Sequence, residues 1–413
     1  MNHNATRIFF HIDVNSAFLS WSAIKKLNEG SPIDLREIPS VIGGDSKMRH
    51  GIVLAKSIPA KKYGIYTSEP LVSARKKCPN LIIEPPEHHY YEEQSRELMQ
   101  HLAGICPDIE QVSIDECYMD FTPIAHLYPS CISAANQIKD TIHSLFGFTV
   151  NIGISDRKVL AKMASDFKKP NLVHTLFHDE IKEKMWSLPV SSLYMCGKSS
   201  IEALRKLGII TIGELATANP EILKLHLKSH GQLLYEYANG IDSSTVTTTP
   251  QEIKGIGNST TLSSDAATAE EAYPILHNLS ESVGARLRQA GKICSLITVE
   301  IKYASFKSVS HQKIVTEATD SNEDIFRNAK ELFDALWDGS PIRLLGIRAG
   351  KLYDTDSPLQ LALSFDEDDN ILNQKHKKLD AALDSIRSKY GNNSVYRGSK
   401  KSASSATCAR KNF

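Results

Sequence analysis

The chain has 413 residues, of which 41% are hydrophobic, and its 48 basic residues balance 48 acidic residues to give a formal net charge of zero. No apolar run approaches the roughly 20 residues that a helix needs to cross a bilayer, which excludes a membrane-spanning protein and leaves enough apolar material for several cores. The neutral charge gives no argument for nucleic-acid binding, which has to rest on local basic faces.

The seven cysteines form no C-x-x-C pair and have no histidines at the spacing of zinc ligands. We therefore expect reduced thiols rather than a zinc site. The first residues, MNHNATR, lack the basic region and apolar stretch of a secretory signal. These features predict a cytoplasmic protein.

The first predicted element is a strand over residues 8–14, a short apolar run that carries Asp13 near its end. A stretch with helical spacing of apolar residues follows. Residues 109–121 then form a second strand region, which contains Asp115 and Glu116. A buried strand that ends in an acid is an informative pattern.

Further along the chain, the pattern predicts a helix over residues 132–145, a strand over 148–154 and a helix that runs to about Lys169. Strands that alternate with helices indicate an α/β or α+β core. Residues 180–238 are helical in pattern, and residues 242–250 have the composition of a linker.

A second compact α+β unit is predicted beyond the linker. Its helices are expected at 269–290 and 321–337, and its strands at 294–304 and 342–353. The stretch after residue 354 has little to bury and is predicted to be a tail with one possible helix over 371–390.

Asp13, Asp115 and Glu116 suggest a metal site. A hard cation such as Mg²⁺ takes oxygen ligands, and two-metal phosphoryl transfer needs carboxylates that bridge two ions about 3.5–4 Å apart. If the strands at 8–14 and 112–121 are neighbours in one sheet, the three acids meet at one edge of it. Adjacent acids on a strand point to opposite faces, so both reach one site only from a turn or a strand end. The alternative is a set of ordinary surface acids.

Separated motifs in a fixed order carry a resemblance to a known family. They are HIDVNSAF at 11–18, SIDECYMD at 113–120, and GIS at 153–155 with Lys162 and KPN at 169–171. Together they resemble the signatures of Y-family translesion DNA polymerases, and their order and spacing are similar to those of the bacterial polymerase IV-like branch over about residues 7–352. Several motifs in the right order are far more specific than any one of them.

The resemblance implies an α+β multidomain protein with the right-hand architecture of a polymerase. Its expected parts are a palm (8–16 and 80–174), fingers (17–79), a helix-hairpin-helix thumb (175–240), a linker (241–251), an α+β little finger that binds DNA (252–353) and a C-terminal tail (354–413).

By the same resemblance, Asp13, Asp115 and Glu116 are catalytic residues that hold two Mg²⁺ ions, and the carbonyl of Val14 helps to hold one of them. Phe18 matches the steric gate that crowds the sugar and excludes a ribose 2′-hydroxyl. Without the motif, Phe18 is read as a plain core residue at the start of a helix.

Lys162 matches a ligand of the incoming triphosphate, whereas its helical position alone fits a solvated lysine. In the fingers, the resemblance predicts a tyrosine and an arginine that contact the triphosphate, but Ile58 and Lys61 stand in those places. Ile58 cannot donate a hydrogen bond, and Lys61 keeps the charge but loses the bidentate fork of arginine.

In the tail, the peptide QLALSF looks like a short clamp-binding segment, with a polar anchor and apolar residues that fit a groove on a sliding clamp. The alternative is an incidental apolar cluster. The residues expected to bind the clamp are Gln360, Leu361, Leu363 and Phe365.

These features predict a template-directed DNA polymerase of low fidelity that acts in lesion bypass. Its expected partners are primer–template DNA, deoxynucleoside triphosphates and a sliding clamp, and we expect a monomer. One rival hypothesis is a non-catalytic DNA-binding accessory of the same fold. Another is a cyclase-type nucleotidyltransferase that works without nucleic acid.

Overall fold

The computed structural model describes residues 7–44, 51–249, 252–356, 367–391 and 394–395. Contacts divide the chain into two compact units, one before and one after the segment at 250–251. Each unit combines a sheet with helices and has its own hydrophobic core, as the sequence predicts.

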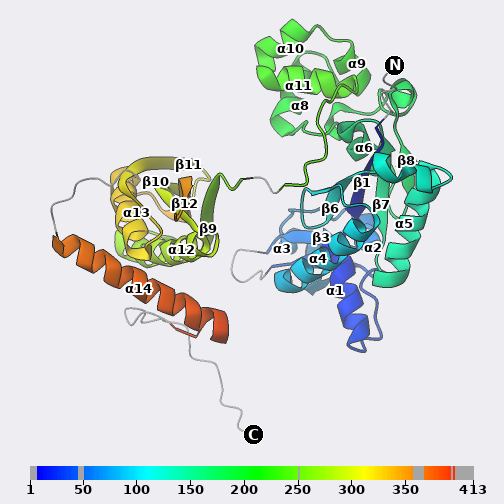
Figure 1. The fold of residues 1–413 in the computed structure, drawn as a ribbon. Helices are drawn as coiled ribbons and strands as arrows, with labels where there is room; N and C mark the ends of the chain where they lie inside the picture. Colours follow the sequence, from blue (N-terminus) through cyan, green and yellow to red (C-terminus); the bar gives the residue numbers. More distant parts are fainter. Residues whose placement is uncertain (1–6, 45–50, 250–251, 357–366, 392–393, 396–413) are drawn as a thin grey trace. The chain divides into compact units, whose positions relative to one another are not determined.

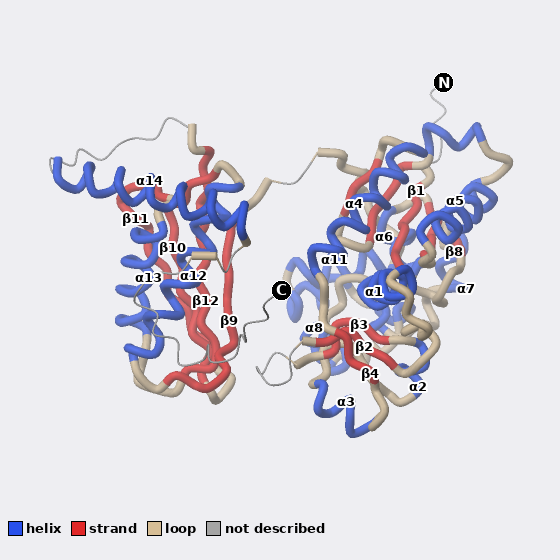
Figure 2. Tube along the Cα trace, turned by 90° about the horizontal axis from the view of Figure 1, so that it is seen from below, coloured by secondary structure: helices blue, strands red, loops and turns tan. Residues whose placement is uncertain are grey.

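A five-stranded sheet lies at the centre of the first unit (Figures 1 and 2), and its strands are ordered β5, β6, β1, β7, β8. β1 is the middle strand and pairs antiparallel with both β6 and β7, which explains why it is buried along almost its whole length. The strands run over Ile109–Gln111 (β5), Glu116–Asp120 (β6), Phe9–Val14 (β1), Val150–Ser155 (β7) and Val173–Thr175 (β8).

Helices cover both faces of this sheet. α4 (His88–Ile105) and α5 (Cys131–Phe146) contribute apolar residues to the core on one face. α6 (Lys158–Ser165) packs on β1 and β7 from the other face. It comes very close there because Gly153 has no side chain: a Cβ atom at this position would lie 1.9 Å from the carbonyl oxygen of Ala161.

α6 is shorter than the sequence predicts, because it ends at Ser165 rather than near Lys169. Residues 166–171 turn back toward the sheet instead. The side-chain amide of Asn151 on β7 donates a hydrogen bond to the carbonyl of Lys168 at 2.7 Å. This polar contact holds the turn, so Lys169 lies over the sheet instead of continuing the helix.

A second, smaller sheet of the first unit has the strand order β3, β2, β4. Its strands are Val53–Lys56 (β3), Ser40–Gly43 (β2) and Ile82–Glu84 (β4). The helices around it are Ala17–Asn28 (α1), Ile58–Lys62 (α2) and Leu71–Lys77 (α3).

Small helices complete the first unit and share a hydrophobic core with α6, which includes Leu160, Met163, Leu204 and Leu234. They are Ile181–Lys184 (α7), Lys198–Lys206 (α8), Ile212–Ala216 (α9), Pro220–Leu227 (α10) and Ser229–Ala238 (α11). Short 3₁₀ helices lie at Thr122–Leu127, His178–Glu180 and Val190–Ser192.

The second unit is a four-stranded antiparallel sheet in the order β11, β10, β12, β9, with two helices packed on one face. Its elements are Gly255–Ala266 (β9), Ala269–Gln289 (α12), Lys292–Tyr303 (β10), Ser308–Thr319 (β11), Asn322–Leu336 (α13) and Ile342–Asp354 (β12). The two helices and the inner strands β10 and β12 were expected from the sequence, whereas the edge strands β9 and β11 were not.

The possible helix at 371–390 is present as α14 (Glu367–Tyr390), and it is longer than predicted. It does not belong to a free tail. Asp380, which is almost fully buried, accepts hydrogen bonds from the backbone and side-chain nitrogens of Asn322 at 2.9 Å, and Arg288 pairs with Asp384 at 2.7 Å. α14 is therefore docked on the helices of the second unit.

Candidate active site

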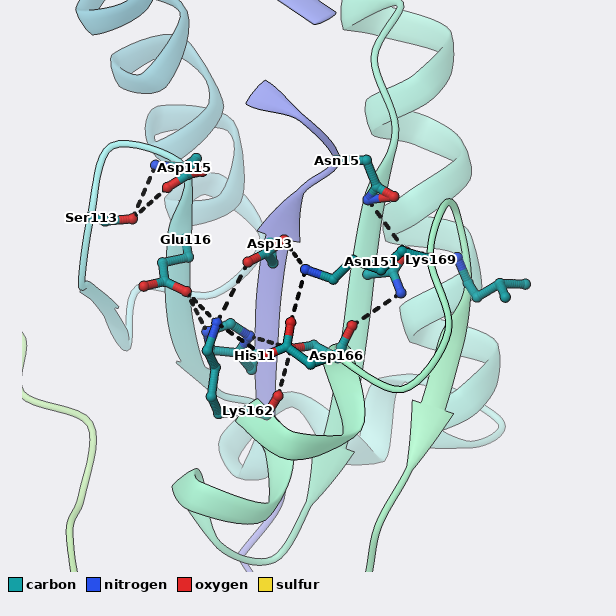
Figure 3. A network of polar contacts seen from close by, with 12 residues as sticks. His11, Asp13, Asn15, Ser113, Asp115, Glu116, Asn151, Lys162, Asp166 and Lys169 are labelled. Carbon is teal, nitrogen blue, oxygen red and sulfur yellow. Dashed lines mark hydrogen bonds and ion pairs between the residues drawn. The ribbon is translucent and has the colours of Figure 1, made fainter. Parts of the chain in front are cut away.

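The pairing of β1 with β6 brings the three acids together (Figure 3). Asp13 near the end of β1 lies opposite Glu116 at the start of β6. Asp115 is in the turn just before β6, and its carbonyl accepts a hydrogen bond from the Val14 N–H at 2.9 Å. The predicted strand region is thus broken into β5, a turn and β6, and this break allows adjacent acids to reach one site.

Two lysine side chains lie among these carboxylates. Lys162 Nζ on α6 is 2.6 Å from Glu116 Oε2 and 3.6 Å from Asp13 Oδ2. Lys169 Nζ is 2.6 Å from Asp13 Oδ1. Burial acts to lower the pKa of both ammonium groups, but the carboxylates outweigh it and raise the pKa. Two positive charges are therefore held stably where β1 ends and β6 begins.

The carboxylates differ in their surroundings. A hydrogen-bonding contact with His11, together with Lys162 and against the effect of burial, lowers the pKa of Glu116 to about 2. Burial, and then the charges of Asp13 and Glu116, raise the pKa of Asp115, although the hydroxyl of Ser113 donates to it at 2.6 Å. Asp115 has no ion pair with any residue that the structure describes, so its charge is the least compensated of the three.

The donor set fits a hard divalent cation. Across the described ranges, no group of three or more His, Cys, Asp or Glu side chains is arranged as a finished metal site. At the carboxylates, however, the ammonium groups of Lys162 and Lys169 lie where positive charge is needed, and Asp115 has none nearby. Mg²⁺ and similar ions take carboxylate oxygens as ligands, and the negative charge of Asp115, which has no cation beside it, favours such an ion here.

His11 belongs to this site, although the sequence analysis uses it only as part of a motif. It precedes Asp13 by two residues on β1, so both side chains lie on the same face of the strand. Its Nδ1 is 2.8 Å from Ser165 Oγ and its Nε2 is 3.3 Å from Glu116 Oε2. Burial lowers the pKa of His11 below its ordinary value of 6.5, although Glu116 favours the charged form. The alternation of the strand was the signal that could have identified it.

Asn15 and Asn151 were also missed by the sequence analysis. The side-chain nitrogen of Asn15 donates to Asn151 Oδ1 at 3.3 Å, and Asn15 Oδ1 accepts from the backbone N–H of Asn171 at 3.0 Å. Together with the Asn151 contact to Lys168, these bonds fix the turn that carries Lys169 to the carboxylates.

Phe18 lies in the first turn of α1, five residues after Asp13. Its ring stacks on that of Tyr91 from α4, with centroids 4.6 Å apart and an interplanar angle of 13°. The hydroxyl of Tyr91 in turn lies 2.6 Å from that of Ser22 on α1. The stacking on Tyr91 holds the ring of Phe18 in one orientation.

The residues expected to bind the triphosphate differ in how far they are exposed to solvent. The side chain of Lys162 is 13% exposed and lies among the carboxylates, whereas Lys61 on α2 is exposed and has no ion pair within the part of the chain that the structure describes. Ile58 is also exposed, at 53%. The structure thus brings Lys162 to the three acids and leaves Lys61 in solvent.

The predicted clamp-binding residues Gln360, Leu361, Leu363 and Phe365 lie outside the described residues. Of the helices that are described, none is long and apolar enough to span a membrane.

Both units of the chain match a known protein family. Residues 12–166 match the impB/mucB/samB family, and residues 253–363 match the C-terminal domain of the same family. The chain is 49% identical over 392 residues to a DNA polymerase IV from Clostridium acetobutylicum, covering 95% of this chain and 98% of that protein. It is 34% identical over 398 residues to DNA polymerase IV 1 from Bacillus subtilis, covering 95% and 93%.

A solved structure shares the fold. A Y-family DNA polymerase chimera, Dbh-Dpo4(243-245)-Dbh, matches with a TM-score of 0.74 and 22% sequence identity over 84% of this chain and 99% of that one. This likeness confirms the α+β multidomain polymerase architecture predicted from the sequence. With the sequence relatives, it shows that the chain belongs to the impB/mucB/samB family and is a low-fidelity, translesion DNA polymerase of the Y family, similar to DNA polymerase IV.

Proposed function

We propose that the chain adds deoxynucleotides to a primer 3′-hydroxyl at Asp13, Asp115 and Glu116, with Mg²⁺ as the divalent metal. The observation that carries this proposal is the convergence of the three carboxylates at the paired ends of β1 and β6, with two lysine ammonium groups between them. Asp13, Asp115 and Glu116 would hold the two ions, with the carbonyl of Val14 as a further ligand.

Two bound Mg²⁺ ions would activate the primer hydroxyl and neutralise charge on the reacting phosphate. The chain's own contribution is position and charge. Lys162 donates to Glu116 at 2.6 Å, and its ammonium group would donate to a phosphate oxygen in place of this carboxylate when the triphosphate binds. Lys61 would meet the outer phosphates as a flexible point charge, in keeping with its exposure.

Phe18 is proposed as the steric gate of the same site. Its flat stacking on Tyr91 supports this role, because a gate has to resist displacement by a 2′-hydroxyl. Exclusion by a fixed ring is a steric effect and needs no hydrogen bond to the sugar.

We also propose the division of the chain into domains that the resemblance implies. The palm would comprise residues 8–16 and 80–174, the fingers 17–79, the thumb 175–240, the linker 241–251 and the little finger 252–353. The five-stranded sheet supports the palm, β2 and β3 with α1–α3 support the fingers, the cluster α7–α11 supports the thumb and the second unit supports the little finger. β4, which pairs with β2, falls within the palm range.

The open face of the second sheet is the proposed contact with the DNA backbone. A hollow of about 620 Å³ lies on this face, and Asn258, Thr298, Ser308 and Arg348 contribute to its lining. Hydroxyl and amide groups with an arginine bind phosphates without selecting a sequence. DNA binding through this face would fall steeply as salt is raised.

The tail peptide with Gln360, Leu361, Leu363 and Phe365 would dock on a sliding clamp, and the chain would act as a cytoplasmic monomer. Six cysteines of the described chain are free, as in a reducing compartment.

The first test is primer extension by the Asp115→Asn variant. Asp115 has the least compensated charge, and its loss removes a bridging ligand, so nucleotide addition should fall roughly a thousandfold. Extension of a labelled primer on a template with Mg²⁺ measures this. Asp140→Asn changes an acid on α5 whose side chain is 69% exposed, and it should extend the primer as the wild type does.

Two results would contradict the proposal. If Asp115→Asn extends the primer normally, the carboxylate assignment is wrong. If the folded wild type binds DNA but adds no nucleotide, the hypothesis of a non-catalytic DNA-binding accessory replaces it. A cyclic product formed from nucleotide alone would instead support the cyclase hypothesis.

A further inference from the structure

A phenylalanine occupies the tip of the hairpin between β10 and β11, at a position that favours glycine. The Phe306 N–H donates to the carbonyl of Tyr303 at 2.8 Å, and the Tyr303 N–H donates to the carbonyl of Lys307 at 2.9 Å. These bonds close a three-residue loop whose last residue, Phe306, has a φ of 66°. A bulky side chain is strained in this left-handed conformation, whereas glycine is not. The loop itself therefore does not call for an aromatic ring.

Burial does not explain the ring either. Phe306 is 61% exposed, so its side chain contributes little to the core of the second unit. Of the described non-glycine residues with positive φ, it is the one aromatic residue. Strained residues that the fold does not require concentrate at functional sites. An exposed ring in this conformation therefore points to a contact with a binding partner.

Cationic side chains surround this ring. Lys302 Nζ lies 5.4 Å from the ring centroid, and Arg343 Cζ lies 4.7 Å from it. Lys307 is the next residue of the chain and is exposed. No ion pair joins these three cations to any residue within the described ranges. The hairpin tip therefore presents positive charge that no carboxylate of the described chain neutralises.

A β-bulge brings one of these cations to the ring. The register of β10 with β12 shifts between Lys302 and Tyr303, and Arg343 is the extra residue of β12 at this shift. A bulge of this kind redirects a side chain. The guanidinium group of Arg343 lies against Phe306 as a result.

The tip continues the sheet face that is proposed to contact DNA. Ile301 and Tyr303 belong to the core beneath the helices, so Lys302 between them lies on the open face. Ser308, which pairs with Lys302 across the hairpin, lines the hollow on that face. The ring and its cations are therefore placed at one end of this hollow.

An exposed aromatic ring among unpaired cations fits single-stranded nucleic acid. Unpaired bases stack on aromatic side chains, and positively charged side chains follow the phosphates between them. A duplex keeps the faces of its bases inside the helical stack along its length, so it offers the ring little to stack on. Because every base has a π-face, stacking tolerates any sequence, as a template requires.

We propose that Phe306, Lys302 and Arg343 form a binding site for single-stranded DNA, in which an unpaired base of the template stacks on the Phe306 ring. This inference goes beyond nucleotide addition, and it rests on the proposed contact of the open face with DNA. Losing a stacked base typically weakens binding by about 5- to 150-fold.

Three substitutions of Phe306 separate stacking from the other properties of the residue. Phe306→Leu keeps the apolar bulk and the strained backbone but has no π-face. Phe306→Tyr keeps the π-face, and Phe306→Gly removes the ring and releases the strain. Fluorescence anisotropy of the full chain measures the affinity for a labelled single-stranded oligonucleotide and for a long duplex. Arg348→Met is the reference for the open face, and circular dichroism checks that each variant folds.

We expect Phe306→Leu and Phe306→Gly to weaken binding of the single strand by about 5- to 150-fold, with Phe306→Tyr within about threefold of the wild type. Binding of the duplex should be unchanged in all three variants and weaker in Arg348→Met. Phe306→Gly should unfold at the same temperature as the wild type or a higher one, because glycine relieves the backbone strain.

The failures of the two proposals are distinguishable. If Phe306→Leu binds the single strand as the wild type does while Arg348→Met weakens duplex binding, the stacking site is wrong and the open-face contact stands. If Phe306→Leu weakens binding of both DNAs alike, the ring does not select single strands and the inference is overturned. If neither substitution changes binding of either DNA, both proposals fall.

A direct readout of stacking does not depend on affinity. Phe306→Trp places an indole at the tip, and its fluorescence is quenched when a base stacks on it. The wild-type chain has three tryptophans, so its own change in emission is subtracted. We expect additional quenching on addition of the single strand and none with the duplex. No additional quenching with the single strand, or equal quenching with both DNAs, would overturn the proposal.

Discussion

The ring of Phe18 lies flat on that of Tyr91, and this stacking gives a test of the steric gate. Phe18→Ala opens space beside the sugar, so ribonucleotide use relative to deoxynucleotide use should rise by roughly 10- to 200-fold. Primer extension with each nucleotide measures the ratio. Tyr91→Phe keeps the supporting ring and removes only the contact with Ser22, so it should discriminate as the wild type does. An unchanged ratio in Phe18→Ala would show that another side chain excludes ribose.

Glu69 gives a pH-dependent contribution to stability. Burial acts to raise the pKa of this carboxyl, but Lys77 and the N–H of Tyr66, each at 2.8 Å, outweigh it and hold the pKa below its ordinary value of 4.5. A lowered pKa stabilises the fold at pH values above 4.5, and this stability is lost as the pH falls through the folded-state pKa.

Glu69→Gln should therefore lower the free energy of unfolding by roughly 2 kcal/mol at neutral pH, with a difference from the wild type that shrinks below pH 4.5. Urea unfolding at several pH values measures it. Lys77→Met removes the ammonium group, so it should reduce the same pH dependence. A difference that stays constant with pH would mean that the charge of Glu69 does not matter.

At the scale of elements, the approach of α6 to the sheet decides the geometry of the site. A methyl group in Gly153→Ala would lie 1.9 Å from the Ala161 carbonyl and 2.5 Å from the Ser165 nitrogen, so the helix has to move. We expect a loss of about 1–3 kcal/mol in the free energy of unfolding. Nucleotide addition should fall as well, because Lys162 moves with α6.

Gly104 on α4 is the matched control for this change. A Cβ atom there meets nothing within 4 Å, and alanine is favoured over glycine in a helix, so Gly104→Ala should raise stability by about 0.5–1 kcal/mol. Denaturant unfolding and primer extension follow both variants. If Gly153→Ala is as active as Gly104→Ala, the site does not depend on the close packing of α6.

At the scale of the whole molecule, the second unit contains α14 in addition to its sheet and the helices α12 and α13. Asp380→Ala removes the acceptor for both nitrogens of Asn322, so it should destabilise this unit by roughly 1–3 kcal/mol. Hydrogen exchange should become faster in α14 and in the first turn of α13, and stay unchanged in the first unit. Unchanged exchange in α14 would show that it does not depend on Asp380.

Glu331→Gln is the control for Asp380→Ala. Glu331 lies on α13, its side chain is 57% exposed, and it pairs with Lys313 on the surface. Substitutions at such positions usually change stability by no more than about 0.5 kcal/mol. A similar loss in both variants would mean that the effect is not specific to the docking of α14.

The elements that the sequence predicted correctly have strong local patterns. β1 is a short apolar run, and α5, α12 and α13 place apolar residues on one face at helical spacing. The edge strands β9 and β11 were missed because they are polar and largely exposed, so they lack both an apolar run and a clear alternation. An edge strand forms because a neighbour pairs with it, and that neighbour is remote in sequence.

The sequence by itself determined the family and singled out Asp13, Asp115 and Glu116, because motifs in a fixed order can be read without coordinates. Only the tertiary structure decided which cations meet these acids. Lys162 reaches Glu116 across 46 positions and Lys169 reaches Asp13 across 156. Apolar periodicity is a local property of the chain, whereas the contacts between these charges depend on the register of β1 with β6 and on the close approach of α6.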